Sequence, residues 1–210
     1  MKPCILALDL STAHGSIAVV RDDRVIFQSS FQSERSHNAQ VFAPLREALT
    51  AAGEDLAGIV IGTGPGSYTG VRISIAAAQG VALSRGVWCV GWSSLTAPDV
   101  EAPSTYRVIG DARRQSFYLA RVEFGRLLPD LEIVSAEEAQ QRLAEGSWLT
   151  FDAKPPLGAE PRVQIARPSA ALLAQRVLSL SDEERTTLAQ QPLIPHYLAE
   201  AFITVPKKKV

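Results

Sequence analysis

The feature that most constrains the fold is a glycine-rich stretch, GTGPGSYTG, at residues 62–70. It follows the short apolar run Ile59–Ile61 and precedes a helical pattern from about Val71 to Leu83. A run so short and so apolar predicts a buried strand, parallel to its neighbours. A strand, a tight loop and a helix in succession predict an α/β fold. We interpret the junction from Gly62 to Gly80 as the main functional surface of the chain.

The glycine loop lacks the side chains that bind phosphate. Its position between a strand and a helix is one where helix amides often hold phosphate groups. A Walker A loop, however, needs a lysine followed by serine or threonine, and here Gly70 is followed by Val71 and Arg72. A dinucleotide fingerprint needs GxGxxG and a later acid. The loop has the wrong glycine spacing, and the next strand ends in Gly91-Trp92. The sequence therefore argues against nucleotide binding by this loop alone.

The helix after the loop is unusually rich in small residues, with the sequence ISIAAAQGVA at positions 73–82. Gly80 costs about 1 kcal/mol of helix propensity relative to alanine, and small residues let two backbones approach closely. One interpretation is tight packing of the helix on its own sheet. A second is that one face packs on the sheet while the other meets another protein. The two interpretations are compatible.

The first half of the chain predicts a complete sheet with helices. The runs at residues 5–10, 16–20 and 24–27 are separated by short polar turns and predict an antiparallel meander. Ser36 is a candidate N-cap, and the fourfold spacing of Val41, Leu45 and Leu49 predicts the buried stripe of a helix that Gly53 ends. With a strand at residues 87–90, the order is β-β-β-α-β-α-β.

A boundary is predicted at residues 102–104, which divides the chain into a first lobe, 1–101, and a smaller α/β lobe, 102–210. In the second lobe we expect a strand pair at 106–109 and 117–122, a helix at 136–143, a strand at 148–151 and a helix at 169–180. No sequence repeat is visible. The two halves share only an aspartate at the end of an early strand.

Composition limits the classes of partner. With 46% hydrophobic and 20% charged residues, the chain is typical of a globular protein, and 21 basic against 22 acidic side chains give a net charge of −1. No overall positive field holds nucleic acid or an anionic membrane. No apolar segment approaches the roughly 20 residues that span a bilayer, and no signal peptide is visible. Cys4 and Cys89 resemble buried thiols of a reducing compartment. A cytoplasmic location is expected.

Two aspartates suggest a degenerate nucleotide site. In actin-like and Hsp70-like ATPases, hairpins of this kind carry Asp-x-Gly, whose glycine lets the backbone approach phosphate. Ser11 stands at the glycine position after Asp9, and Arg113 stands at the corresponding position after Asp111. No later glycine pair is present to hold an adenine. We therefore expect no bound cofactor.

Catalytic and metal-binding templates also fail. The histidines His14, His37 and His196 fall in different elements, and none has a metal-ligand partner at helical spacing. Neither HExxH nor GxSxG occurs. The tail Lys207–Lys209 is interpreted as a solvated terminus. The sequence predicts no catalytic residue and no metal site.

Taken together, these segments resemble the bacterial TsaB (YeaZ) family. The resemblance covers nearly the whole chain and is densest between residues 59 and 96. It rests on five segments: Ile5–Asp9, Gly64–Arg72, Gln79-Gly80, Ile109–Arg113 with the following Phe117-Tyr118, and Pro195–Leu198.

The resemblance implies a two-lobed actin/Hsp70-like fold (ASKHA, with the ribonuclease H-like motif) whose second lobe is smaller and degenerate. It also implies a role in forming N6-threonylcarbamoyladenosine (t6A) at position 37 of tRNAs that read ANN codons. In that system the related TsaD protein is the catalytic subunit, assisted by the small ATPase TsaE. The TsaB-type member is a scaffold that activates TsaD, forms a homodimer when alone, and reaches tRNA only through the complex. The metal-binding histidines of the catalytic relative align near Ser94 and Pro98, neither of which is a good ligand.

The resemblance, with the small-residue helix, predicts a partner surface on the two first-lobe helices, which homodimer and heterodimer would share. The expected contacts are His37, Gln40, Val41, Pro44, Arg72, Ile75, Ala76 and Gln79. Two alternatives stay open: an independent ATPase, against which Ser11 and Arg113 argue, and a peptidase, for which no metal or nucleophile constellation is present.

Overall fold

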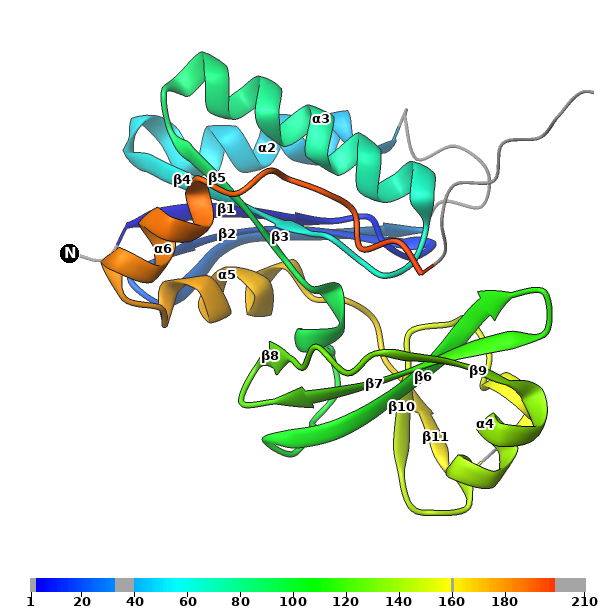
Figure 1. Ribbon diagram of the computed structural model, residues 1–210. Coiled ribbons are helices and arrows are strands. Elements are labelled where there is room, and N and C mark those ends of the chain that lie inside the picture. Colours follow the sequence, from blue (N-terminus) through cyan, green and yellow to red (C-terminus); the bar gives the residue numbers. More distant parts are fainter. Residues whose placement is uncertain (1–2, 33–39, 160, 199–210) are drawn as a thin grey trace, which may run out of the picture.

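The computed structural model describes residues 3–32, 40–159 and 161–198 (Figure 1). Two β-sheets form two lobes, with helices packed around them. The predicted N-cap Ser36, the predicted contact His37 and the tail Lys207–Lys209 lie outside the described residues.

The first sheet confirms the predicted antiparallel meander and the predicted buried strand that is parallel to its neighbours. Its strand order is β3-β2-β1-β4-β5. The first three strands form an antiparallel meander, and β4 and β5 continue the sheet parallel to β1. This is the arrangement of the ribonuclease H-like motif, so the predicted fold class is confirmed. The strands are β1 (Cys4–Asp9), β2 (His14–Arg21), β3 (Arg24–Gln32), β4 (Leu56–Gly62) and β5 (Trp88–Trp92).

Two helices cover one face of this sheet. The helix α2 (Phe42–Ala52) ends at Gly53, as predicted, and a short 3-10 turn (Gly53–Asp55) leads to β4. The helix α3 (Tyr68–Arg85) begins earlier than the sequence predicts, because the Ser67 side chain caps it by accepting a hydrogen bond from the Gly70 amide. Both helices pack on the core side of the strands that carries Leu6 and Leu8.

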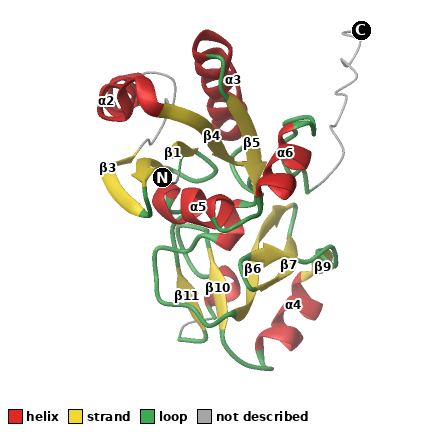
Figure 2. Cartoon of the chain, turned by 90° about the vertical axis from the view of Figure 1, so that its left-hand side faces the viewer, coloured by secondary structure: helices red, strands yellow, loops and turns green. Residues whose placement is uncertain are grey.

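The opposite face of the first sheet is covered by helices from the far end of the chain, which corrects the predicted lobe boundary. The helices α5 (Ala170–Leu178) and α6 (Asp182–Ala189) pack on the first sheet and not within the second lobe (Figures 1 and 2). The physical reason lies in β1, which is buried on both faces. Ile5 and Ala7 point away from the first core, and Leu173 and Val177 of α5 belong to the cluster that covers them.

The second sheet repeats the plan of the first. Along the path β8-β7-β6-β10-β11, it again places antiparallel strands before two strands parallel to the first of them. A sixth strand, β9, lies off this path and also pairs with β7 antiparallel. The strand pair β6–β7 and the helix α4 occur where the sequence predicts them. The elements are β6 (Thr105–Arg113), β7 (Ser116–Glu123), β8 (Arg126–Leu127), β9 (Glu132–Ser135), α4 (Ala136–Leu143), β10 (Trp148–Thr150) and β11 (Val163–Ile165).

The second lobe is a reduced version of the first. Where the first lobe places the long helix α3 between its two parallel strands, the described residues of the second form a 3-10 turn (Pro156–Gly158). Two segments connect the lobes, one around a 3-10 turn (Ser94–Thr96) and one before α5. They are held together by a bridge between Pro98 and Pro168 and by the hydrogen bond from the Asp99 amide to the Arg167 carbonyl, 2.9 Å. Within the described residues, no helix combines the length and hydropathy needed to cross a membrane.

The docking of α5 on the first sheet predicts a large loss of stability when its core contact is removed. Leu173 is fully buried, whereas Leu83 on α3 is 87% exposed. We expect Leu173→Ala to lower the free energy of unfolding by about 2–5 kcal/mol. The matched Leu83→Ala change should alter it by less than about 0.5 kcal/mol. Urea denaturation measures both, and equal effects would contradict the assignment of α5 to the first-lobe core.

Candidate functional site

The glycine-rich junction is pressed against the turn between β1 and β2. The Ser67 amide donates to the Ser11 carbonyl over 2.6 Å. A Cβ added at Gly66 would lie 2.1 Å from that carbonyl oxygen, and one at Gly70 would lie 1.9 Å from the Leu10 carbonyl oxygen. Only glycine permits so close an approach of two backbones. The glycines of this loop therefore serve contact within the chain.

Several amides that could bind a phosphate are already engaged. The Thr63 amide donates to the Trp92 carbonyl over 2.9 Å, and the Gly64 amide donates to Ser94 Oγ over 2.9 Å. The Val71 amide bonds the Ser67 carbonyl inside the helix. A phosphate would have to displace these bonds, so the geometry argues, as the sequence did, against a phosphate cradle.

The first aspartate, Asp9, is fully buried at the end of β1. Its Oδ1 accepts hydrogen bonds from the Ser11 amide at 2.8 Å and the Ser11 hydroxyl at 2.6 Å. Oδ2 has no hydrogen-bond partner among the described residues. Burial raises the pKa of this carboxyl, while the hydroxyls of Ser11 and Ser94 lower it by less. In this lobe, the amide and hydroxyl of Ser11 therefore hold the turn by bonding Asp9.

The second aspartate makes the same turn in the second lobe. Asp111 Oδ1 accepts a hydrogen bond from the Arg113 amide over 2.7 Å, and the Asp111 amide donates to Asp152 Oδ2 over 2.7 Å. Arg113 has a φ of 75°, a left-handed conformation that favours glycine. The backbone therefore keeps the shape of an Asp-x-Gly hairpin, although an arginine occupies the glycine position. The aspartate shared by the two halves lies at equivalent places in the two sheets.

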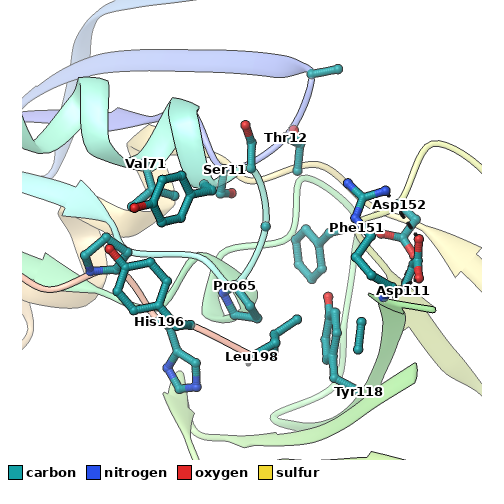
Figure 3. A pocket seen from close by; sticks show the side chains of 18 of the residues that line it. Ser11, Thr12, Pro65, Val71, Asp111, Tyr118, Phe151, Asp152, His196 and Leu198 are labelled. Atoms are coloured by element: carbon teal, nitrogen blue, oxygen red, sulfur yellow. Dashed lines mark hydrogen bonds and ion pairs between the residues drawn. The ribbon is translucent and has the colours of Figure 1, made fainter. Parts of the chain in front are cut away.

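A cleft of about 1050 Å³ separates the two hairpins (Figure 3). Ser11 and Thr12 line it from the first lobe, and Asp111, Tyr118 and Phe151 line it from the second. Charged groups on the second-lobe side include Arg113, Asp152 and Lys154. Burial raises the pKa of Asp152, an effect that the Asp111 amide partly offsets. The four residues of the degenerate nucleotide site thus belong to two hairpins that face one cleft.

A wall of this cleft comes from the end of the described chain, which the sequence interpretation left without a structural role. Pro195–Leu198 lies along the glycine junction, where the His196 amide donates to the Thr63 carbonyl over 2.8 Å. The Tyr197 ring lies 5.4 Å from the Tyr68 ring at the start of α3. Burial lowers the pKa of His196. No helical or strand periodicity marks this segment, so only its match to the family pattern could have indicated a role.

The predicted partner residues divide into exposed and buried ones. Gln40, Arg72, Ala76 and Gln79 are exposed, and Pro44 is half-buried. Val41 and Ile75 are core residues, at 0% and 8% exposure, which corrects their place on the predicted surface. Val41 is the N-cap residue of α2 and Ile75 lies on the inward face of α3, and both belong to the core under these helices. His37 is outside the described residues.

Two exposed apolar residues were missed by the sequence prediction. Leu83 continues the solvent-facing stripe of α3 that Arg72, Ala76 and Gln79 begin, at the spacing of one helix face. Phe42 is exposed at the start of α2, on the same side of the sheet as α3 (Figure 2). The spacing from Ala76 to Gln79 and Leu83 could have identified the leucine.

The structure shows the surroundings of the candidate metal-ligand positions and of the two cysteines. No group of three or more His, Cys, Asp or Glu side chains able to hold a metal is found among the described residues. Ser94, one of the two positions aligned with metal-binding histidines, is buried and accepts the Gly64 amide. Cys4 and Cys89 are free thiols. Burial raises the pKa of Cys89 to about 12, which keeps it protonated and unreactive.

Comparisons with known proteins find TsaB relatives and a match to the family model of the related TsaD protein. Residues 31–157 match the family model described as TsaD: tRNA N6-adenosine threonylcarbamoyltransferase. The tRNA threonylcarbamoyladenosine biosynthesis protein TsaB of Escherichia coli is 30% identical, over 92% of this chain and 94% of its own. TsaB of Bacillus subtilis is 31% identical, but the match spans 63% of each chain. The solved structure of YeaZ from Pseudomonas aeruginosa has the same fold, with a TM-score of 0.67 and 23% identity over 93% of this chain and 100% of that one.

The contact between the junction and the β1–β2 turn predicts opposite effects for two glycine substitutions in one helix. A Cβ at Gly70 would collide with a backbone carbonyl, whereas a Cβ at Gly80 would meet nothing within 4 Å. We expect Gly70→Ala to lower the free energy of unfolding by about 1–3 kcal/mol. Gly80→Ala should raise it by about 0.5–1 kcal/mol. Urea denaturation of both variants tests this, and a stable Gly70→Ala protein would show that the close approach is dispensable.

Proposed function

The chain belongs to the TsaB (YeaZ) family of tRNA threonylcarbamoyladenosine biosynthesis proteins, and on that premise we propose that it is a non-catalytic scaffold in the formation of t6A at position 37 of tRNAs reading ANN codons. Its direct partner is a TsaD-type catalytic subunit, which it holds and activates. A TsaE-type ATPase belongs to the same complex, and tRNA is reached through the complex. The setting is the cytoplasm.

The observation that carries this proposal is the solvent-facing stripe of α3. Its side chains are small or uncharged except for Arg72, and it ends in the 87% exposed Leu83. Next to this stripe, Gly80 has open space where a side chain would be. A helix face without bulk lets another helix approach closely, and an exposed leucine supplies apolar area to bury. These properties suit a protein partner better than a small ligand.

The same face suits a second copy of this chain. A stripe of one charged, one amide and two apolar side chains carries little to discriminate between partners. We therefore place the homodimer and the complex with the catalytic subunit on overlapping surfaces, so that one excludes the other. The exposed Phe42 on α2 and the predicted contact Gln40 extend this surface beyond α3.

The hairpins support the non-catalytic part of the proposal. In the first, Ser11 uses its amide and hydroxyl to bond Asp9, and its carbonyl binds the glycine junction. In the second, the Arg113 side chain stands 3.6 Å from Asp111 in an ion pair. In both turns, groups of Ser11 and Arg113 thus bond an aspartate of their own chain, where an Asp-x-Gly hairpin would present a bare backbone to phosphate. Chemistry on tRNA then requires another subunit.

The proposed function is tested by depletion and complementation. Depleting the protein should lower t6A in bulk tRNA, measured by mass spectrometry of nucleosides, and the wild-type gene should restore it. An unchanged t6A level after depletion would contradict the proposed function.

The partner surface is tested by placing a charge on it. Ala76→Arg should weaken binding to the TsaD-type subunit at least about thirtyfold, since a buried unpaired charge costs about 2–5 kcal/mol. It should also abolish homodimers and fail to restore t6A. Ala144→Arg is the matched control, because Ala144 is an exposed alanine at the end of α4 in the second lobe. Calorimetry and analytical ultracentrifugation measure the two kinds of binding. An Ala76→Arg protein that still binds the subunit and still dimerises would exclude this face.

A further inference from the structure

Residues 191–198, here called the strap, attach to both lobes. Leu193 packs against the first-lobe core, where its Cδ2 would lie 3.3 Å from a Cβ added at Gly91. The hydrogen bond from the His196 amide to the Thr63 carbonyl then fixes the strap to the glycine junction. Leu198 packs against the second-lobe core, the cluster that includes Tyr118 and Phe151 (Figure 3).

The strap adds a connection between the lobes, at a place where it limits their movement. The two segments of chain that pass between the lobes are held together at Pro98 and Pro168 and form a hinge. An ion pair between Arg126 of β8 and Glu184 of α6, at 2.7 Å, also joins the lobes. The strap lines the cleft that lies between the hairpins. A link across the cleft opposes rotation about the hinge, because opening would draw Leu198 out of the second-lobe core.

The strap is also joined to the partner surface through one aromatic side chain. Tyr68, the first residue of α3, contacts Tyr197 of the strap at a ring distance of 5.4 Å. The guanidinium of Arg72 lies over the same Tyr68 ring, 5.1 Å from its centre, and donates a hydrogen bond to the Tyr68 hydroxyl. Arg72 therefore holds the ring on which Tyr197 rests, and it is also part of the solvent-facing stripe of α3.

We propose that the strap is a latch on the interlobe hinge, and that a protein bound to the α3 stripe releases it by drawing Arg72 away from Tyr68. This inference rests on the proposed function for the identity of the partner. The latch itself is a property of the isolated chain. An acidic group on the partner would form an ion pair with the Arg72 guanidinium. Tyr68 would then lose its hydrogen bond and its ring contact with Arg72, and the ring that Tyr197 packs against would no longer be held in place. If the partner favours the released strap by some factor, linkage requires that release of the strap raise the affinity for the partner by the same factor.

Hydrogen exchange at the His196 amide tests the latch in the full chain without any partner. This amide exchanges when the strap opens, so its rate reports the open fraction. Tyr68→Ala and Tyr197→Ala should each raise that rate about threefold to tenfold, the effect of losing one aromatic pair. Tyr68→Phe keeps the ring but removes the acceptor of Arg72, so it should raise the rate by a smaller factor, as should Arg72→Ala.

Arg85→Ala is the matched control. Arg85 lies in the last turn of the same helix, where it pairs with Glu54 at 3.2 Å, far along α3 from Tyr68. This substitution should leave the His196 rate unchanged. If Arg72→Ala has no more effect than Arg85→Ala, the coupling between the α3 stripe and the strap is wrong. If Tyr197→Ala leaves the rate unchanged, the latch itself is wrong.

Adding the TsaD-type subunit separates this inference from the proposed function. Binding should raise the His196 exchange rate of the wild-type protein. Tyr197→Ala should tighten that binding, because the variant has already lost part of the contact that binding must break, although Tyr197 lies outside the stripe. Absence of binding would contradict the proposed function and leave the results on the isolated chain standing. Binding with an unchanged His196 rate would contradict release of the latch alone.

Discussion

The close contact between the glycine junction and the β1–β2 turn is the constraint on which the rest of the structure depends. Because Gly66 and Gly70 let two backbones meet, α3 starts directly beside the end of β1. That starting point sets which face of α3 meets the sheet and which faces solvent. It also engages the Ser67 amide and the Ser11 carbonyl in a bond within the chain. One contact thus closes the loop on the chain itself and orients the solvent-facing stripe of α3.

The two lobes share one plan of strands and turns. Both sheets have the same strand order, and both place an aspartate in an equivalent turn. The left-handed φ of Arg113 is one that favours glycine. The cleft between the turns persists, and the chain's own strap forms part of its wall. The strap in this cleft contacts both lobes and so favours one arrangement of them.

Much of the fold could be predicted from the sequence where the signal is local. The meander, the junction and the β6–β7 pair follow from apolar runs and turns a few residues apart. The docking of α5 could not, because its partners lie more than a hundred residues away and nothing local marks which sheet it covers. The strap has no periodicity at all. At the site, the spacing that put Val41 on a buried stripe already excluded it from the surface, whereas Leu83 was missed because the stripe was not followed to the end of the helix.

The return of α5 to the first sheet has a consequence for the order in which the molecule is made. The face of β1 that carries Ile5 and Ala7 is synthesised long before the helix that covers it, which starts at Ala170. The first lobe is therefore incomplete until the second has been synthesised. Its contacts are long-range, which slows folding and leaves apolar surface uncovered in the meantime. The second lobe, an insertion in the first, is positioned to fold before the lobe that precedes it.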